Sequence, residues 1–86
     1  MRLLLTIKIW REGKYYIAYC PELEVASQGK DFQHALNKVK EAVEAFLEET
    51  KRMGTFEEVL KQAGFVKEKQ EWRSPLISIS PIEINV

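Results

Sequence analysis

The sequence contains few of the side chains that metal centres and nucleophilic active sites use most: it has one cysteine, Cys20, and one histidine, His34. A lone cysteine cannot form an internal disulfide, which fits a reducing intracellular setting, so we expect a cytoplasmic protein. The four glycines stand singly, which argues against a glycine-rich phosphate loop. Apolar residues open the chain, but Lys8 interrupts them and the stretch is too short to span a bilayer, so we expect no membrane segment.

An excess of charge of either sign is also absent. Thirteen basic and thirteen acidic residues give a formal net charge of zero. A protein that holds nucleic acid by neutralising phosphates needs a basic excess, which the chain as a whole lacks, although a local basic patch is compatible with this balance. The basic residues of the central segment alternate with glutamates, so they predict a solvated mixed face rather than a basic stripe.

Three strand patterns occupy the first third of the chain. Residues 1–10 alternate apolar and polar side chains, as a half-buried strand does. Residues 15–20 are aromatic and β-branched, and Pro21, which has no backbone donor, ends that strand. A polar turn containing Gly13 predicts an antiparallel hairpin, and a third strand at residues 25–28 completes a meander.

Two helices are predicted after this meander. The first, over about residues 32–52, is the strongest periodic signal, with apolar side chains at three- and four-residue steps. We expect Gly29 to supply the flexible turn before it, and Asp31 to cap it by accepting hydrogen bonds from free amides of the first helical turn. The second helix, at about residues 56–63, is shorter.

The C-terminal part begins with a mostly charged stretch, residues 66–74, which is either a loop or a ragged strand with Trp72 as its one large anchor. Residues 76–86 form another strand pattern, in which the apolar side chains change parity at Pro81. That change predicts a bulge or kink and an edge position. Together the patterns predict a single α+β domain of order βββααβ, with one four-stranded, mainly antiparallel sheet and both helices packed on one face.

Several groups of residues resemble the HicB family, over roughly the first 50 residues. They are Tyr19-Cys20-Pro21-Glu22-Leu23, Ser27-Gln28-Gly29-Lys30-Asp31, and the helical pairs Ala35-Leu36, Ala42-Val43 and Leu47-Glu48. The sequence departs from the commonest pattern at Glu24-Val25, where many members have a Pro-Gly pair and one more residue. HicB proteins are the small antitoxins of HicA–HicB toxin–antitoxin pairs, together with short stand-alone relatives.

The resemblance implies a partial RNase-H-like fold and a protein partner. That partner is a HicA-type toxin, a small basic RNA-cleaving protein that the antitoxin blocks sterically. Longer HicB proteins carry a DNA-binding module after the sheet, whereas no recognition helix follows the last predicted strand here. We therefore expect no C-terminal DNA-binding domain, and no specific DNA binding by this chain alone.

Few residues are candidates for catalysis. An RNase-H-type nuclease needs several carboxylates that converge around metal ions, but Glu22 and Glu24 are expected at a corner and Glu83 on the last strand. His34 is better explained as a solvated residue of the first helical turn, and Cys20 as a small buried apolar residue. We predict that the protein is not an enzyme and has no catalytic, metal-binding or cofactor-binding residues.

Five apolar or aromatic side chains lie outside the predicted core: Leu4, Trp10, Tyr15, Ile17 and Tyr19. They indicate either an imperfectly polar outer face, which is normal in proteins, or an interface, which we favour because the cluster carries few charges. The candidates for contact with a partner are Tyr15, Tyr19, Glu22 and Glu24. The two glutamates would meet a basic toxin, or else form an ordinary solvated corner. The candidates for self-association, in a homodimer or a higher homo-oligomer, are Leu4, Trp10, Ile82 and Ile84.

Two functions follow from these features. One is a HicB-like antitoxin that binds and sterically neutralises a HicA-type RNA-cleaving toxin. The alternative is a stand-alone homo-oligomeric HicB-like protein with a scaffold or ligand-binding role and no toxin partner.

Overall fold

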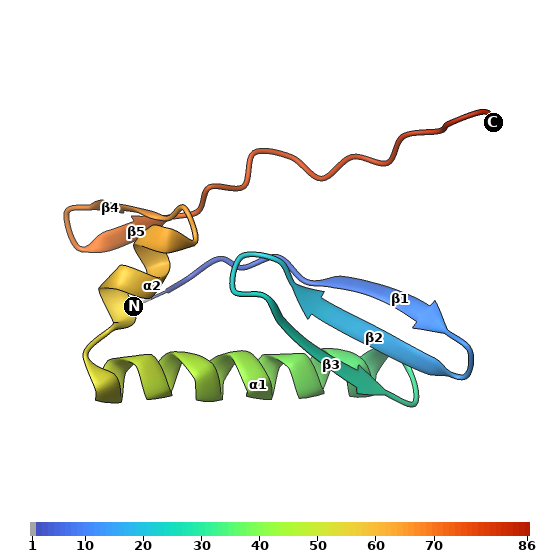
Figure 1. The fold of residues 1–86 in the computed structure, drawn as a ribbon, viewed down its shortest axis with the longest axis horizontal. Helices are drawn as coiled ribbons and strands as arrows, with labels where there is room; N and C mark the ends of the chain where they lie inside the picture. The colour runs from blue at the N-terminus through green and yellow to red at the C-terminus, as the bar shows by residue number, and fades with distance from the viewer. Residues whose placement is uncertain (1) are drawn as a thin grey trace.

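Two layers make up most of the molecule: a three-stranded sheet and a long helix that runs beneath it (Figure 1). The computed structural model describes residues 2–86. The elements are β1 (Lys8–Glu12), β2 (Tyr15–Cys20), β3 (Val25–Gly29), α1 (Phe32–Met53), α2 (Phe56–Gln62), β4 (Val66–Glu68) and β5 (Glu71–Arg73). Strands β1, β2 and β3 form one antiparallel sheet in that order, and β4 and β5 form a separate two-stranded sheet. The α+β class is confirmed.

Alternation along β2 decides which side chains of the sheet face α1. Ala18 and Cys20 are fully buried against the helix, so the neighbouring Ile17 and Tyr19 face the opposite side. Strands β1 and β2 pair antiparallel through a turn in which Gly13 has φ 59°. The predicted hairpin is therefore confirmed, with a glycine where left-handed backbone requires it.

Helix α1 begins and ends at the residues that the sequence indicates. The Asp31 carboxylate accepts a hydrogen bond from the backbone amide of His34 at 2.8 Å, so the predicted cap is confirmed. Gly54, at φ 75°, closes the last turn in the left-handed conformation. The apolar residues of α1 that are buried against the sheet are Ala35, Val39 and Val43.

A second apolar cluster joins α2 to the β4–β5 hairpin. Its buried members are Leu60, Phe65 and Trp72. Lys67 of β4 forms an ion pair with Glu57 of α2 at 2.9 Å, and this lysine lowers the pKa of the Glu57 carboxyl. The charged stretch after α2 is thus a short hairpin, and Trp72 is its buried anchor, because the other side chains of both strands are exposed.

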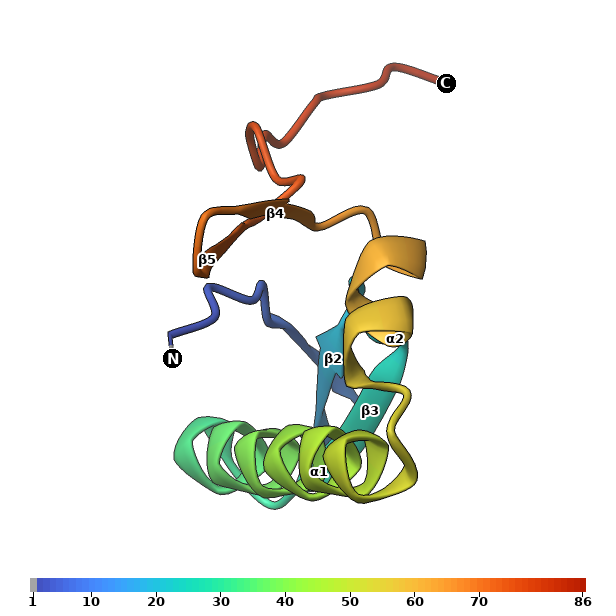
Figure 2. The same cartoon turned by 90° about the vertical axis from the view of Figure 1, so that its left-hand side faces the viewer.

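The prediction of four strands in one sheet is wrong, because residues 76–86 form no strand in the structure. Residues 75–86, which we call the C-terminal arm, leave the hairpin and project away from both layers (Figures 1 and 2). A strand needs a neighbouring backbone to satisfy its amides, and within residues 2–86 no strand pairs with the arm. Pro75 and Pro81 also lack amide donors, which further weakens any ladder within the chain.

The first strand is shorter than residues 1–10, because β1 starts only at Lys8. Met1 lies outside the described residues. Residues 2–7 lie beyond the point where β2 ends at its corner, and no backbone pairing with β2 is formed there. A side chain accepts a hydrogen bond from this segment instead. The amide of Thr6 donates to both carboxylate oxygens of Glu22 at 3.1 Å. This segment is therefore held by a side chain rather than by a neighbouring strand.

The corner between β2 and β3 has a residue in an unfavourable backbone conformation. Glu24 has φ 56°, a left-handed value that costs a side-chain-bearing residue about 1–2 kcal/mol. Glycine relieves that cost but loses more entropy on folding. We expect Glu24→Gly to raise the free energy of unfolding by about 0.5 kcal/mol and the Tm by about 3 °C. Thermal unfolding followed by circular dichroism measures both.

Glu24→Ala is the matched control, since it removes the same carboxylate without relieving the backbone. We expect its Tm to stay at or below that of the parent protein. If both variants shifted the Tm equally, the effect would come from the side chain, and the backbone explanation would fail.

Candidate functional site

The face of the sheet opposite α1 is the candidate binding surface, which we call the outer face. Its side chains are Lys8, Trp10 and Glu12 of β1, Tyr15, Ile17 and Tyr19 of β2, and Ala26 and Gln28 of β3. Trp10 lies opposite Ile17 on the neighbouring strand, with Tyr19 and Tyr15 at the flanking pairs. Among the described residues, neither helix packs on this face, since α1 lies on the other side.

Two of the three aromatic side chains of the outer face are exposed, and the third, Tyr19, is half-buried. Trp10 is 40% exposed and Tyr15 is 39% exposed, values that are high for side chains of this size. The indole Nε1 of Trp10 donates to Glu12 at 3.1 Å, and the Lys14 ammonium lies 5.7 Å from the centre of the Tyr15 ring. Charged groups therefore border the aromatic centre, as in the core and rim of a protein interface.

The apolar and aromatic residues among the predicted site residues divide between three places in the fold. Tyr15 and Tyr19 lie together on the outer face, and so does Trp10, which had been assigned to self-association. Leu4 lies instead on the segment before β1, where it is exposed. Ile82 and Ile84 lie on the C-terminal arm, beyond the hairpin. The structure thus gathers the aromatic candidates on one face and places the aliphatic ones elsewhere.

Glu22 and Glu24 have different environments, although both occupy the corner. The half-buried Glu22 carboxylate accepts two hydrogen bonds from the Thr6 amide and lies 3.6 Å from the Cys20 thiol. It therefore holds the segment before β1 onto the corner, a role that the sequence does not reveal. The Glu24 side chain is exposed, so it is the more accessible of the two carboxylates for a basic partner.

Cys20 and His34 both have local structural roles. Burial raises the pKa of the Cys20 thiol, and the nearby Glu22 carboxylate adds to the effect, so the reactive thiolate is disfavoured. In the first turn of α1, His34 Nδ1 accepts a hydrogen bond from the Lys30 amide at 3.0 Å. The imidazole thus tightens the cap that Asp31 begins.

Within residues 2–86, no group of three or more histidine, cysteine, aspartate or glutamate side chains is arranged to hold a metal ion. Over the same residues, no helix has the length and apolar character needed to cross a membrane.

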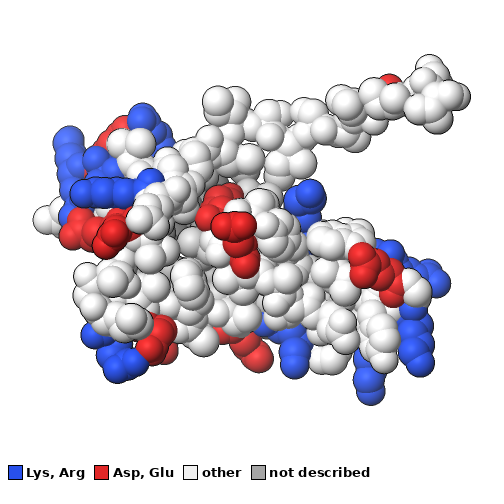
Figure 3. Space-filling model, viewed as in Figure 1, with Lys and Arg blue, Asp and Glu red and all other residues white. Residues whose placement is uncertain are grey.

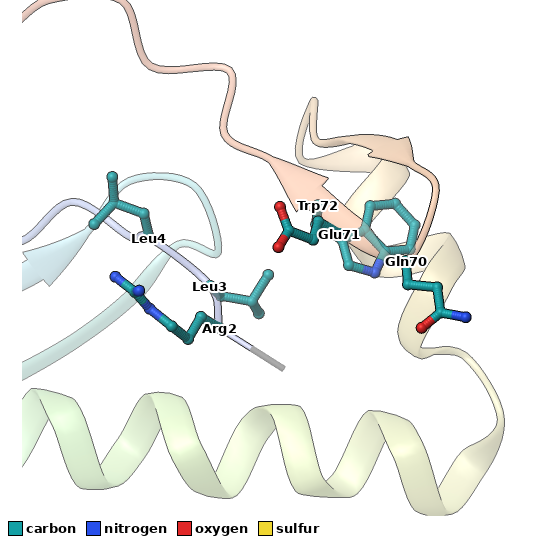
Figure 4. A pocket seen from close by; sticks show the side chains of 6 residues that line it. All are labelled: Arg2, Leu3, Leu4, Gln70, Glu71 and Trp72. Carbon is teal, nitrogen blue, oxygen red and sulfur yellow. The ribbon is translucent and has the colours of Figure 1, made fainter.

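Two of the hollows that border the segment before β1 each have a volume of about 550 Å³. One is a groove between this segment and α1, which we call the N-terminal groove. Its apolar lining includes Leu3, Leu5, Ile7, Val43, Leu47 and Phe56. The other lies between the start of the chain and β5, where Arg2, Leu3 and Leu4 approach Trp72 and its neighbours (Figure 4). Both depend on tertiary packing, and no local sequence signal predicts them.

Comparison with known proteins identifies no relative of this chain: no family model, no curated protein and no solved structure matches it.

Proposed function

We propose that this chain is a HicB-like antitoxin that binds a HicA-type RNA-cleaving toxin and neutralises it sterically. The observation that carries the proposal is the outer face, where Trp10, Tyr15, Ile17 and Tyr19 form an apolar surface that α1 leaves uncovered. The family part of the proposal, including the partial RNase-H-like type of fold, rests on the sequence resemblance described above.

The proposed mechanism requires contact and no chemistry. A toxin that cleaves RNA presents a basic surface to its substrate. The aromatic centre of the outer face supplies apolar area for binding, and the exposed carboxylates of Glu12 and Glu24 supply charge complementary to a basic partner. While the complex persists, RNA cannot reach the covered surface. On this proposal the chain acts in the cytoplasm, is not an enzyme and binds no specific DNA by itself.

Co-expression with any small basic protein that is encoded beside this chain tests the proposal. We expect a stable complex in which RNA cleavage by the partner is suppressed. The double variant Trp10→Ala/Tyr19→Ala removes two aromatic anchors and is expected to weaken binding about 100-fold, measured by isothermal titration calorimetry.

Phe32→Ala is the matched control, because Phe32 is an exposed aromatic residue of α1 and lies away from the outer face. We expect it to bind as tightly as the parent protein. Equal weakening by Phe32→Ala, or full suppression of cleavage by the double variant, would contradict binding through the outer face. Failure of every neighbouring small basic protein to bind would overturn the antitoxin function itself.

The stand-alone homo-oligomer is the second candidate function. The exposed apolar residues of the C-terminal arm favour it, because they form a surface separate from the outer face.

A further inference from the structure

The C-terminal arm carries six exposed large apolar side chains, and within residues 2–86 no strand pairs with it. Ile77 is 99% exposed, Ile82 is 80% exposed and Ile84 is 67% exposed. Figure 3 shows the arm as almost free of charge, and Glu83 is its one acidic residue. An extended, uncharged and β-branched segment of this kind favours pairing with another backbone.

The order of residues in the arm gives it two different sides. Ile77 and Ile79 alternate with serines, and after Pro81 the apolar positions are Ile82, Ile84 and Val86, alternating with Glu83 and Asn85. If the arm forms a strand, a bulge at Ser80-Pro81 would bring these five apolar side chains onto one side and leave the serines, Glu83 and Asn85 on the other. The arm therefore has the pattern of a strand that is buried on one face only.

The sheet has an edge that matches this pattern. β1 pairs with β2 on one side, and within residues 2–86 no strand pairs with its other side. The N-terminal groove lies on the helix side of the segment that leads into β1, with Leu5, Ile7 and Val43 in its lining. A strand added at this edge would satisfy the free backbone groups of β1 and place its apolar face over the groove.

We propose that the arm of a second copy of this chain pairs with β1 as a fourth strand, and that the exchange is reciprocal and forms a two-fold dimer. Ile82, Ile84 and Val86 pack toward the N-terminal groove of the second copy. Glu83 then faces the outer side of the sheet, where Lys8 of β1 is the complementary charge. This proposal is independent of the toxin-binding function, because it uses the edge of the sheet rather than its outer face.

The place where the arm leaves the domain favours exchange between copies. Residues 75–80 approach Thr6, Lys8 and Glu22, so the arm starts near β1, but its last residues project away from their own sheet (Figures 1 and 2). An arm that starts beside an edge and points outward reaches the same edge of a second copy related by two-fold symmetry. The twelve residues of the arm, when extended, span on the order of 40 Å, which is enough to cover β1 and the segment before it. The formal net charge of zero imposes no net repulsion between copies.

Multi-angle light scattering and sedimentation equilibrium of the full chain test the proposal. We expect twice the 10.0 kDa mass of the chain. The double variant Ile82→Lys/Ile84→Lys places charges on the apolar side of the arm and is expected to raise the dimer dissociation constant about 100-fold. Leu4→Glu, an exposed change at the rim of the N-terminal groove, is expected to weaken the dimer from the other side of the same contact.

Asn85→Lys is the matched control, because it adds a charge to the polar side of the same arm and is expected to leave the dimer intact. In a dimer of one isotope-labelled and one unlabelled copy, filtered NMR spectra should contain contacts between the Ile82 and Ile84 methyl groups of one copy and Ile7 of the other. A monomeric parent protein overturns the proposal, as do arm contacts confined to one chain. A dimer that survives Ile82→Lys/Ile84→Lys unchanged also overturns it, because association would then use another surface.

Discussion

Gly29→Ala is expected to lower the free energy of unfolding by about 3 kcal/mol, a large part of the stability of a domain of this size. A β-carbon built on Gly29 lies 2.5 Å from the backbone nitrogen of Ala35 and 2.9 Å from its α-carbon. Both atoms belong to the first turn of α1, so no side chain can rotate away to make room. The helix would have to move off the end of β3, and its buried contacts would loosen. Urea unfolding followed by circular dichroism measures the loss.

Gly13→Ala is the control that separates close packing from backbone conformation. A β-carbon at Gly13 meets no atom within 4 Å, but this residue has φ 59° in the β1–β2 turn. We expect a cost of about 1 kcal/mol from the left-handed backbone alone. If Gly29→Ala cost no more than Gly13→Ala, the close approach of β3 and α1 would be disproved.

Trp72→Ala is expected to unfold the β4–β5 hairpin locally and to cost about 3–5 kcal/mol. Trp72 is the buried side chain of the hairpin and packs with Leu60 and Phe65 in the second apolar cluster. A two-stranded hairpin in water is marginal by itself, so the exposed Lys67–Glu57 ion pair cannot hold it in place alone. Native-state hydrogen exchange should show protection lost over residues 64–73 and retained in β2 and the first half of α1.

Trp72→Phe keeps an aromatic side chain in the cluster and serves as the matched control. We expect it to cost less than half as much and to leave the hairpin protected. Equal loss of protection throughout the chain in Trp72→Ala would mean that the two apolar clusters unfold as one unit, contrary to the local unfolding expected here.

The outer face and the C-terminal arm can be changed by separate variants. Toxin binding and dimer formation can therefore be tested independently. Trp10→Ala/Tyr19→Ala changes the outer face, whereas Ile82→Lys/Ile84→Lys changes the arm. If both proposals hold, the first variant loses the toxin and remains a dimer, while the second loses the dimer and still binds the toxin. Two outer faces in one dimer would then allow one assembly to bind two toxins.

Local chemistry made much of the fold predictable from the sequence. Pro21 ends a strand because it lacks an amide, and Asp31 caps α1 through a carboxylate three residues from its donor. Helix α1 matches its predicted range to within a residue because its periodic apolar side chains are buried against the sheet. Each of these causes acts within a few residues of its effect.

The aromatic residues of the candidate surface were also visible in the sequence, through alternation. Side chains two residues apart share a face of a strand, so Tyr15, Ile17 and Tyr19 had to lie together once Cys20 was buried. The sequence did not indicate that Trp10 would join them, because this required the register of β1 against β2. It also did not distinguish the engaged Glu22 from the exposed Glu24.

Residue patterns along the chain specify most of the strands and helices, because these elements depend on neighbours in the sequence. Which segments pair with one another depends on the tertiary structure. Residues 76–86 carry a strand pattern and remain unpaired, since a ladder needs a second backbone within hydrogen-bonding distance. In the same way, Gly29 looked like a flexible turn, but the structure requires a glycine there because α1 packs too closely on the end of β3 to admit a β-carbon. The first outcome depends on whether a second backbone lies beside the segment, and the second on how closely the start of α1 approaches the end of β3. The residue pattern along one segment specifies neither distance.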